Sequence, residues 1–186
     1  MPSLSPPISF SVSEILSLPE IFHREAISPE GFVTSIQAAR YPGMAAKVKD
    51  LSALAKKLQF EYVKEIAGTS GLPVRPEESE KGSTFYLLRR PLIRMGPPEA
   101  AGEGVSRRKV LGGFLVAPED RGKGILETRA FADGKDLIVV VSLEDYRSAI
   151  RGTAPTASLR TWLYLQTQAR LHETVGKRFL RGFQPS

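Results

Sequence analysis

The chain contains no cysteine, which excludes disulfides, thiolate metal sites and a cysteine nucleophile. A chain without cysteine fits a reducing compartment, so we expect a cytoplasmic protein. The start MPSLSPPISF lacks the basic residues and the unbroken apolar run of a secretory signal. No apolar stretch approaches the ~18 residues that a membrane-spanning helix needs. The sequence therefore predicts no membrane span.

Catalytic and metal-binding motifs are also missing. The only two histidines are His23 and His172, and neither belongs to a paired histidine–carboxylate motif. There is no nucleophile elbow, phosphate loop or dinucleotide fingerprint. We therefore predict no metal site and no cofactor, and we expect a non-enzymatic function more than an enzymatic one.

Positive charge is in excess and unevenly placed. The 186 residues carry a net charge of +6, while the apolar share of 41% and charged share of 25% are ordinary for a globular protein. Arg89–Lys109 and Leu159–Phe183 each carry a net +4, so the remaining residues sum to −2. Localised basic charge attracts nucleic acid, anionic lipid or an acidic partner. A solvated surface is the simpler interpretation.

The strongest pattern lies near the end of the chain, where Ser158–Gly182 has the period of one amphipathic basic helix. Its apolar side carries Trp162, Leu165, Ala169, His172, Val175, Gly176, Phe179, Leu180 and Phe183. Its basic residues lie on the other side or its flanks. A helix of this kind needs an apolar surface to cover, and the strand-rich segment before it is the only large candidate.

Helical patterns dominate the expected N-terminal part. We predict a poorly ordered arm over 1–10, helices within 11–67 and a linker over 68–82. Ser28-Pro29-Glu30 resembles a capped helix start, with Pro42 as its end. The best helix covers Met44–Ala67, although residues 58–66 also alternate like a strand.

From residue 83 the period changes to that of β-strands. The expected strands are Thr84–Arg89, Lys109–Ala117, Gly124–Phe131 and Asp136–Leu143, with a loop at Gly96–Gly104. Asp133-Gly134 between apolar runs predicts a hairpin, and Gly112-Gly113 predicts a bulge or close approach. Both faces of these strands are apolar. One helix covers one face, so the other must meet the N-terminal helices, a second protomer in a homodimer, or an internal cavity.

These elements predict an α+β fold of one compact domain, with N-terminal helices, an antiparallel meander of four or more strands and a long C-terminal helix across the sheet. The stretches RRKVLGGFLVAPEDRGKGILETRAF, DLIVVVSLEDY and LRTWLYLQTQARLHETVGKRFLRGF follow one another in an order that resembles the helix-grip pattern of the START-like (SRPBCC, polyketide-cyclase-related) superfamily over residues 85–183. The resemblance implies a cavity between sheet and helix and a hydrophobic ligand, and it implies no universal catalytic residue.

Three functions follow from these observations. The first is binding of a hydrophobic small molecule between the sheet and the C-terminal helix, with these residues as candidates: Ala169, His172, Gly176, Trp162, Leu165, Glu127, Arg129 and Tyr146. The second is a nucleic-acid-binding or assembly protein with a basic patch of Arg89, Arg90, Arg94, Arg107, Arg108, Lys109, Arg160, Arg170, Lys177, Arg178 and Arg181. The third is a cyclase or hydrolase with His172 as acid or base, although a buried, hydrogen-bonded histidine is the simpler interpretation.

Overall fold

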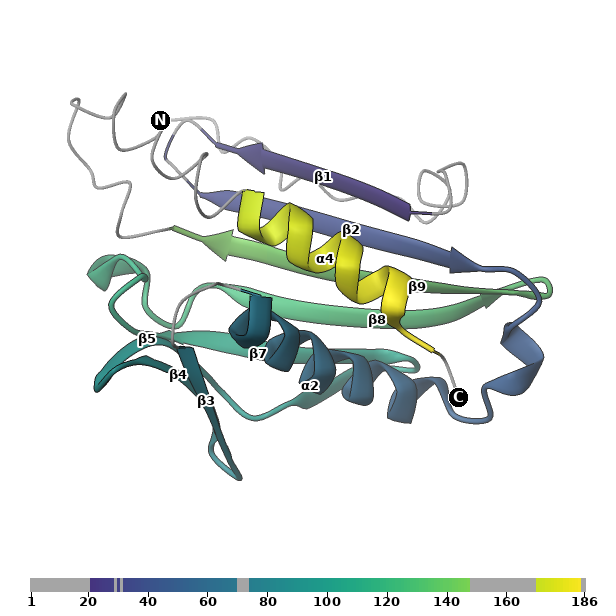
Figure 1. Cartoon of the computed structure of the whole chain (residues 1–186), viewed down its shortest axis with the longest axis horizontal. Coiled ribbons are helices and arrows are strands. Elements are labelled where there is room, and N and C mark those ends of the chain that lie inside the picture. The colour runs from purple at the N-terminus through teal and green to yellow at the C-terminus, as the bar shows by residue number, and fades with distance from the viewer. Residues whose placement is uncertain (1–20, 29, 31, 70–73, 148–169, 185–186) are drawn as a thin grey trace.

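The computed structural model describes residues 21–28, 30, 32–69, 74–147 and 170–184 and has an α+β architecture (Figure 1). Nine antiparallel strands form one sheet in the order β1-β2-β9-β8-β7-β5-β4-β3, with β6 also paired to β7. The strands are β1 (Ile21–Ile27), β2 (Val33–Tyr41), β3 (Val74–Ser79), β4 (Gly82–Leu87), β5 (Arg90–Met95), β6 (Glu99–Gly102), β7 (Val105–Gly112), β8 (Ile125–Asp133) and β9 (Asp136–Tyr146). The helices are α2 (Leu51–Thr69) and α4 (Arg170–Gly182), with short 3-10 turns η1 (Ala45–Lys47) and η2 (Pro118–Asp120).

The N-terminal helices predicted over residues 21–41 are wrong, because this segment forms the antiparallel pair β1 and β2. The Ser28 hydroxyl accepts a hydrogen bond from the Phe32 amide at 3.2 Å, and the Ser28 amide donates to the Phe32 carbonyl at 2.8 Å. The hydroxyl that resembled a helix cap therefore serves a turn between two strands, a role that serine fills equally well. The predicted arm over 1–10 and any helix within 11–20 lie outside the described residues.

The helix predicted over Met44–Ala67 is confirmed from Leu51 onward as α2, and residues 58–66 are helical, whereas Ala45–Lys47 form the separate turn η1. The carboxylate of Asp50 accepts a hydrogen bond from the Ala53 amide at 2.9 Å. Asp50 thus supplies the side-chain cap that α2 needs at its start.

The sheet extends beyond the four predicted strands. The hairpin at Asp133-Gly134 is confirmed, since Asp133 pairs with Asp136 and Gly134 has a φ of 60°. β3 lies inside the predicted linker and β6 inside the predicted loop. Both have mostly exposed side chains, so they form through backbone pairing and carry no apolar alternation.

Both faces of the sheet are buried along β2 and β9, whereas residues alternate between buried and exposed along β7. The two helices lie side by side on one face, α2 over β7 and β8 and α4 over β1 and β2 (Figure 1). This helix face joins Leu58, Val139 and Phe179 in the main core. The opposite face has its own buried cluster of Ile36, Ala38, Ile138 and Val140, with Phe22 and Phe131 against it.

The described part of the C-terminal helix is an integral part of the core. Val175, Phe179, Leu180 and Phe183 are buried, and the Phe179 ring meets Tyr62 edge-on at 5.5 Å between ring centres. Trp162, Leu165 and Ala169, which the sequence placed on the same apolar side, lie outside the described residues. No helix within the described ranges combines the length and apolar character required to cross a membrane.

A buried arginine connects the sheet to α2. The Arg108 side chain is 2% exposed. Its guanidinium donates to the Ser83 hydroxyl, to the Gln59 side-chain oxygen at 3.2 Å and to the Glu78 carboxylate at 2.8 Å. Gln59 in turn donates to the carbonyls of Ser106 and Leu126 at 3.1 and 3.0 Å. Arg108 is therefore a structural residue, and its place in the predicted basic patch is wrong.

Candidate anion-binding groove

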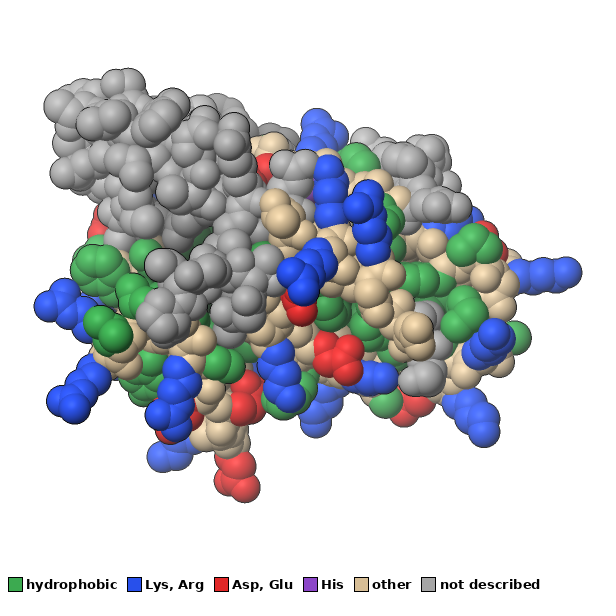
Figure 2. Space-filling model, viewed as in Figure 1, with side chains coloured by type: hydrophobic (Ala, Val, Ile, Leu, Met, Phe, Trp, Pro, Cys, Tyr) green, Lys and Arg blue, Asp and Glu red, His purple; other side chains and the backbone are tan. Residues whose placement is uncertain are grey.

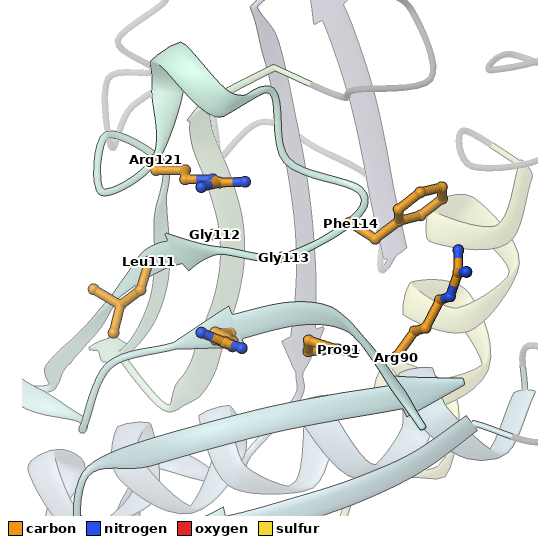
Figure 3. A pocket seen from close by; sticks show the side chains of 8 residues that line it. Arg90, Pro91, Leu111, Gly112, Gly113, Phe114 and Arg121 are labelled. Atoms are coloured by element: carbon orange, nitrogen blue, oxygen red, sulfur yellow. The ribbon is translucent and has the colours of Figure 1, made fainter. Parts of the chain in front are cut away.

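A groove of about 440 Å³ opens between β5 and the segment that follows β7 (Figure 3). Its lining residues are Arg90, Pro91, Arg94, Leu111, Gly112, Gly113, Phe114 and Arg121. Arg90 and Phe114 lie at one end of the groove, Leu111 lies at the other, and Arg121 extends over Gly112. The groove thus combines three cationic side chains with aliphatic and aromatic surface, and no described acidic residue lines it.

Two glycines shape the groove, as the predicted close approach required. Arg94 pairs with Gly112, and the register shifts between this pair and the next, which is an irregularity of the β5–β7 ladder. A side chain at Gly113 would place its Cβ 2.3 Å from the Leu92 carbonyl oxygen, and Gly113 also has a φ of 126°. A Cβ at Gly112 would lie 3.2 Å from the Arg121 side chain. Only glycine fits at residue 113 without a backbone shift.

The strand predicted over Lys109–Ala117 ends earlier than expected, because β7 stops at Gly112. The following segment turns toward β5, where the Phe114 amide donates to the Pro91 carbonyl at 2.9 Å and the Leu115 amide donates to Leu92 at 3.0 Å. The Tyr146 hydroxyl donates to the Leu115 carbonyl at 2.8 Å. These bonds hold Phe114 at the groove with 63% of its surface exposed.

A cluster of charged residues holds in place the wall of the groove that carries Arg121. Asp120 is buried and accepts hydrogen bonds from Arg147 and from Lys123, the latter at 2.9 Å. Burial of the Asp120 carboxyl opposes its ionisation, but the two hydrogen bonds outweigh burial and hold the pKa below its usual range. The neighbour of Arg121 therefore stays a carboxylate that anchors the wall.

Several arginines of the sheet, such as Arg107, Arg108 and Arg129, have a carboxylate partner, whereas the groove arginines have none among the described residues. Arg90, Arg94 and Arg121 form no ion pair with any residue that the structure describes, and all three are exposed. Arginine presents up to five N–H donors in a planar fork that suits carboxylate, sulfonate or phosphate oxygens. An anion entering the groove would therefore not compete with an existing carboxylate.

The residues of the predicted basic patch differ in their partners and exposure within the described residues. Arg90 and Arg94 line the groove and Arg89 lies in the turn before β5, whereas Arg107 pairs with Glu127. Lys109 is exposed on β7. On α4, Arg178 pairs with Glu65 at 3.3 Å, Arg181 is exposed and Lys177 is half-buried. Arg160 and the side chain of Arg170 lie outside the described residues.

Four of the predicted ligand-binding residues have described side chains or backbone positions: Glu127, Arg129, Tyr146 and Gly176. Glu127 is buried and pairs with Arg107 and Arg129, and Tyr146 is buried against Leu115. Gly176 lies directly against Gln37, because a Cβ there would be 1.4 Å from the Gln37 side-chain oxygen. Residue 172 lies on α4, but its side chain falls outside the described part of the structure, as do residues 162, 165 and 169.

Sequence reasoning missed Arg121 and Phe114 as members of a site. Arg121 lies 27 residues after Arg94 in the chain, and only the turn after β7 brings them to one groove. The sequence pattern predicts Phe114 in the interior of a strand. The signal that pointed to this place was Gly112-Gly113, which marks a backbone that approaches another strand closely.

Solved structures with a similar arrangement include START-like proteins. A START superfamily protein from Mycobacterium smegmatis matches with 8% identity over 80% of this chain and 99% of the other, with a TM-score of 0.32. Zhui aromatase/cyclase from Streptomyces sp. R1128 matches with 14% identity over 87% and 94%, with a TM-score of 0.34. The major latex-like protein 151 of Panax ginseng matches with 15% identity over 79% and 98%, with a TM-score of 0.37.

The TM-scores of these neighbours lie below 0.5, so the likeness carries no weight in assigning a family or a function. No protein-family model matches the chain, and no curated protein matches it.

Proposed function

We propose that the protein binds a small molecule that combines an anionic group with an apolar body, and that the groove between β5 and the segment after β7 is the site. The observation that carries this proposal is the convergence of Arg90, Arg94 and Arg121, without acidic partners among the described residues, on one groove of about 440 Å³. This volume lies in the range of about 300–1,000 Å³ that is usual for small-molecule sites.

The chemistry of the two walls defines the class of ligand. Arg94 and Arg121 supply charge-assisted hydrogen bonds to an anion. Pro91, Leu111 and the exposed ring of Phe114 supply apolar surface that a purely ionic ligand would leave uncovered. A ligand with an anionic group and an apolar body would contact both the arginines and the apolar surface of the groove.

Replacement of the groove arginines is expected to remove this binding. The probe is anilinonaphthalene sulfonate, which carries one sulfonate and an aromatic body and whose fluorescence rises on binding. A hydrogen bond to a charged group contributes roughly 1.5–3 kcal/mol, and each 1.4 kcal/mol is about tenfold in affinity. Arg94→Gln/Arg121→Gln should therefore bind the probe more than about tenfold more weakly, measured by fluorescence titration.

The matched control is Lys81→Gln/Lys135→Gln, which removes the same charge from two exposed turns outside the groove. It should bind the probe as the parent protein does. Equal loss of affinity in both double variants would show a nonspecific charge effect, and unchanged affinity in the arginine variant would refute the groove as the site.

A second candidate site lies between α4 and the sheet, where the sequence predicted a hydrophobic ligand. The support for this site is that the sheet surface beneath α4 changes from apolar to polar along β2. Ala39 is apolar, whereas Gln37 and Ser35 are buried polar residues that pair with His23 and Glu25 of β1. A ligand with an apolar body and one polar group suits such a surface. Because Gly176 is packed against Gln37, this proposal depends on Ala169 and His172.

The test is Ala169→Leu, read with the neutral apolar dye Nile red. If residue 169 borders a cavity, the parent protein binds the dye and the variant loses this binding while its melting temperature changes little. If the residue packs tightly, the larger side chain destabilises the fold by roughly 1–3 kcal/mol. Destabilisation together with no dye binding by the parent protein would remove this candidate.

A further inference from the structure

The exposed apolar side chains of the structure gather around the groove. Among the described residues, the large hydrophobic side chains that are exposed are Leu88, Leu111 and Phe114, at 81%, 47% and 63%. Single exposed hydrophobic residues are normal on a protein surface. Here Leu111 and Phe114 both line the groove, and Leu88 lies two residues before Arg90. Such clustering marks a surface that contacts something apolar.

Leu88 occupies a position that its side chain disfavours. It is the first of the two residues that join β4 to β5, and its φ is 58°, while Arg89 is not among the residues with positive φ. A two-residue hairpin turn of this pattern favours glycine at its first position. Leucine is unfavourable here for two reasons. Its apolar side chain is exposed to water, and its backbone lies in the left-handed region, which disfavours residues with a side chain. Neither local structure nor packing within the described residues explains its presence.

Leu88 and Phe114 lie at the same end of the molecule. Leu87 and Arg90 pair across the β4–β5 turn, and the next residue, Pro91, accepts the hydrogen bond of the Phe114 amide. We call Leu88, Arg89, Arg90 and Phe114 the apex. Figure 2 shows basic and hydrophobic side chains gathered at the left-hand edge of the molecule, which is the end where β4 meets β5 in Figure 1.

We propose that the apex docks on an anionic lipid membrane. Leu88 and Phe114 enter the boundary between headgroups and acyl chains, and Arg89 and Arg90 contact lipid phosphates. Lipid fits better than nucleic acid, because bases are held mainly by stacking on aromatic rings, and Phe114 is the one aromatic side chain of the apex, beside the aliphatic Leu88. The inference rests on the proposed function for the cationic groove beside the apex, and on Leu88 for the insertion.

The absence of cysteine allows a direct test of insertion. Leu88→Cys labelled with a nitrobenzoxadiazole dye places one reporter at the apex, and Lys135→Cys places the same reporter in the exposed β8–β9 turn. The proteins are mixed with phosphatidylcholine vesicles that contain or lack phosphatidylserine. We expect brighter, blue-shifted emission from residue 88 with the anionic vesicles only, weaker at high salt, and unchanged emission from residue 135.

An unlabelled variant separates function from structure at Leu88. Leu88→Gly suits the turn better, so its melting temperature should stay equal or rise. If the leucine side chain is buried in lipid, the affinity of the variant for anionic vesicles should fall by about tenfold, because such burial contributes roughly this factor. Sedimentation with the vesicles measures this affinity. Leu88→Gly also leaves the groove residues in place, so binding of anilinonaphthalene sulfonate should not change.

Several results would overturn the docking. These are no sedimentation with anionic vesicles, equal sedimentation with neutral ones, or an unchanged signal from residue 88 in the bound state. Binding of a labelled single-stranded oligonucleotide without vesicle binding would also overturn it and assign the apex to nucleic acid. If the probe still binds the groove in these cases, the proposed function stands alone. Vesicle binding without probe binding would leave the docking and remove the proposed function.

Discussion

Removal of residues 170–186 is expected to abolish the cooperative unfolding of the protein. This segment contains α4 and Phe183, and it buries Val175, Phe179, Leu180 and Phe183. Fully burying a side chain of this size contributes roughly 1.5–3 kcal/mol, so the four contribute about 6–12 kcal/mol. The whole stability of a typical domain is about 5–15 kcal/mol. Thermal unfolding followed by circular dichroism measures the result.

A graded variant keeps this prediction measurable if the truncated chain cannot be purified. Phe179→Ala removes the ring that contacts Tyr62 and should cost about 3–5 kcal/mol. Arg181→Gln is the matched control, because it lies on the same helix but is exposed, and it should change stability by less than about 0.5 kcal/mol. A truncated protein that melts sharply near the temperature of the full chain would contradict the role of α4.

Loss of the Arg108 side chain is expected to have the next largest effect. Arg108→Met keeps a long apolar stem but removes the donors to Ser83, Gln59 and Glu78. A hydrogen bond to a charged group contributes roughly 1.5–3 kcal/mol. Losing the two hydrogen bonds to the buried residues Ser83 and Gln59 should therefore cost about 3–6 kcal/mol of stability. At about 2–4 °C per kcal/mol for a chain of this size, the melting temperature should fall by roughly 6–24 °C.

Lys109→Met is the control for this variant. It makes the same kind of change at the next residue of β7, where the side chain is exposed, and its melting temperature should stay close to that of the parent. Arg108→Lys should be intermediate, because an ammonium cannot reproduce the planar fork of donors. If Arg108→Met melts with the parent, the network contributes no stability and Arg108 returns to the residues available for binding.

Local patterns predicted the elements that local forces shape. The helical period and the cap at Asp50 are local signals, and they predicted α2 correctly. Asp133-Gly134 is likewise a local turn signal, and it predicted the β8–β9 hairpin. The prediction of which residues form the apolar side of the C-terminal helix was also correct over Val175–Phe183. Ser28-Pro29-Glu30 misled, because a hydroxyl that accepts a backbone N–H looks the same at a helix start and at a strand turn.

The groove could be predicted only in part. Arg90 and Arg94 stood out as charges, and Gly112-Gly113 as a close approach of backbones. Arg108 could not be told from Arg107 in sequence, yet the strand alternation puts the former inside with Gln59 and the latter outside with Glu127. Which face of β7 is buried depends on α2, more than 40 residues earlier in the chain.

The sequence by itself determined that this protein has an amphipathic C-terminal helix, an antiparallel meander with apolar residues and two basic segments. These follow from side-chain period and charge, which each segment carries alone. Tertiary structure decided that Ile21–Ile27 and Val33–Tyr41 are strands, because β2 pairs with β9 and its buried side chains need that partner. It also decided which arginines stay without a carboxylate in the described structure, since pairing depends on neighbours that only the folded sheet supplies.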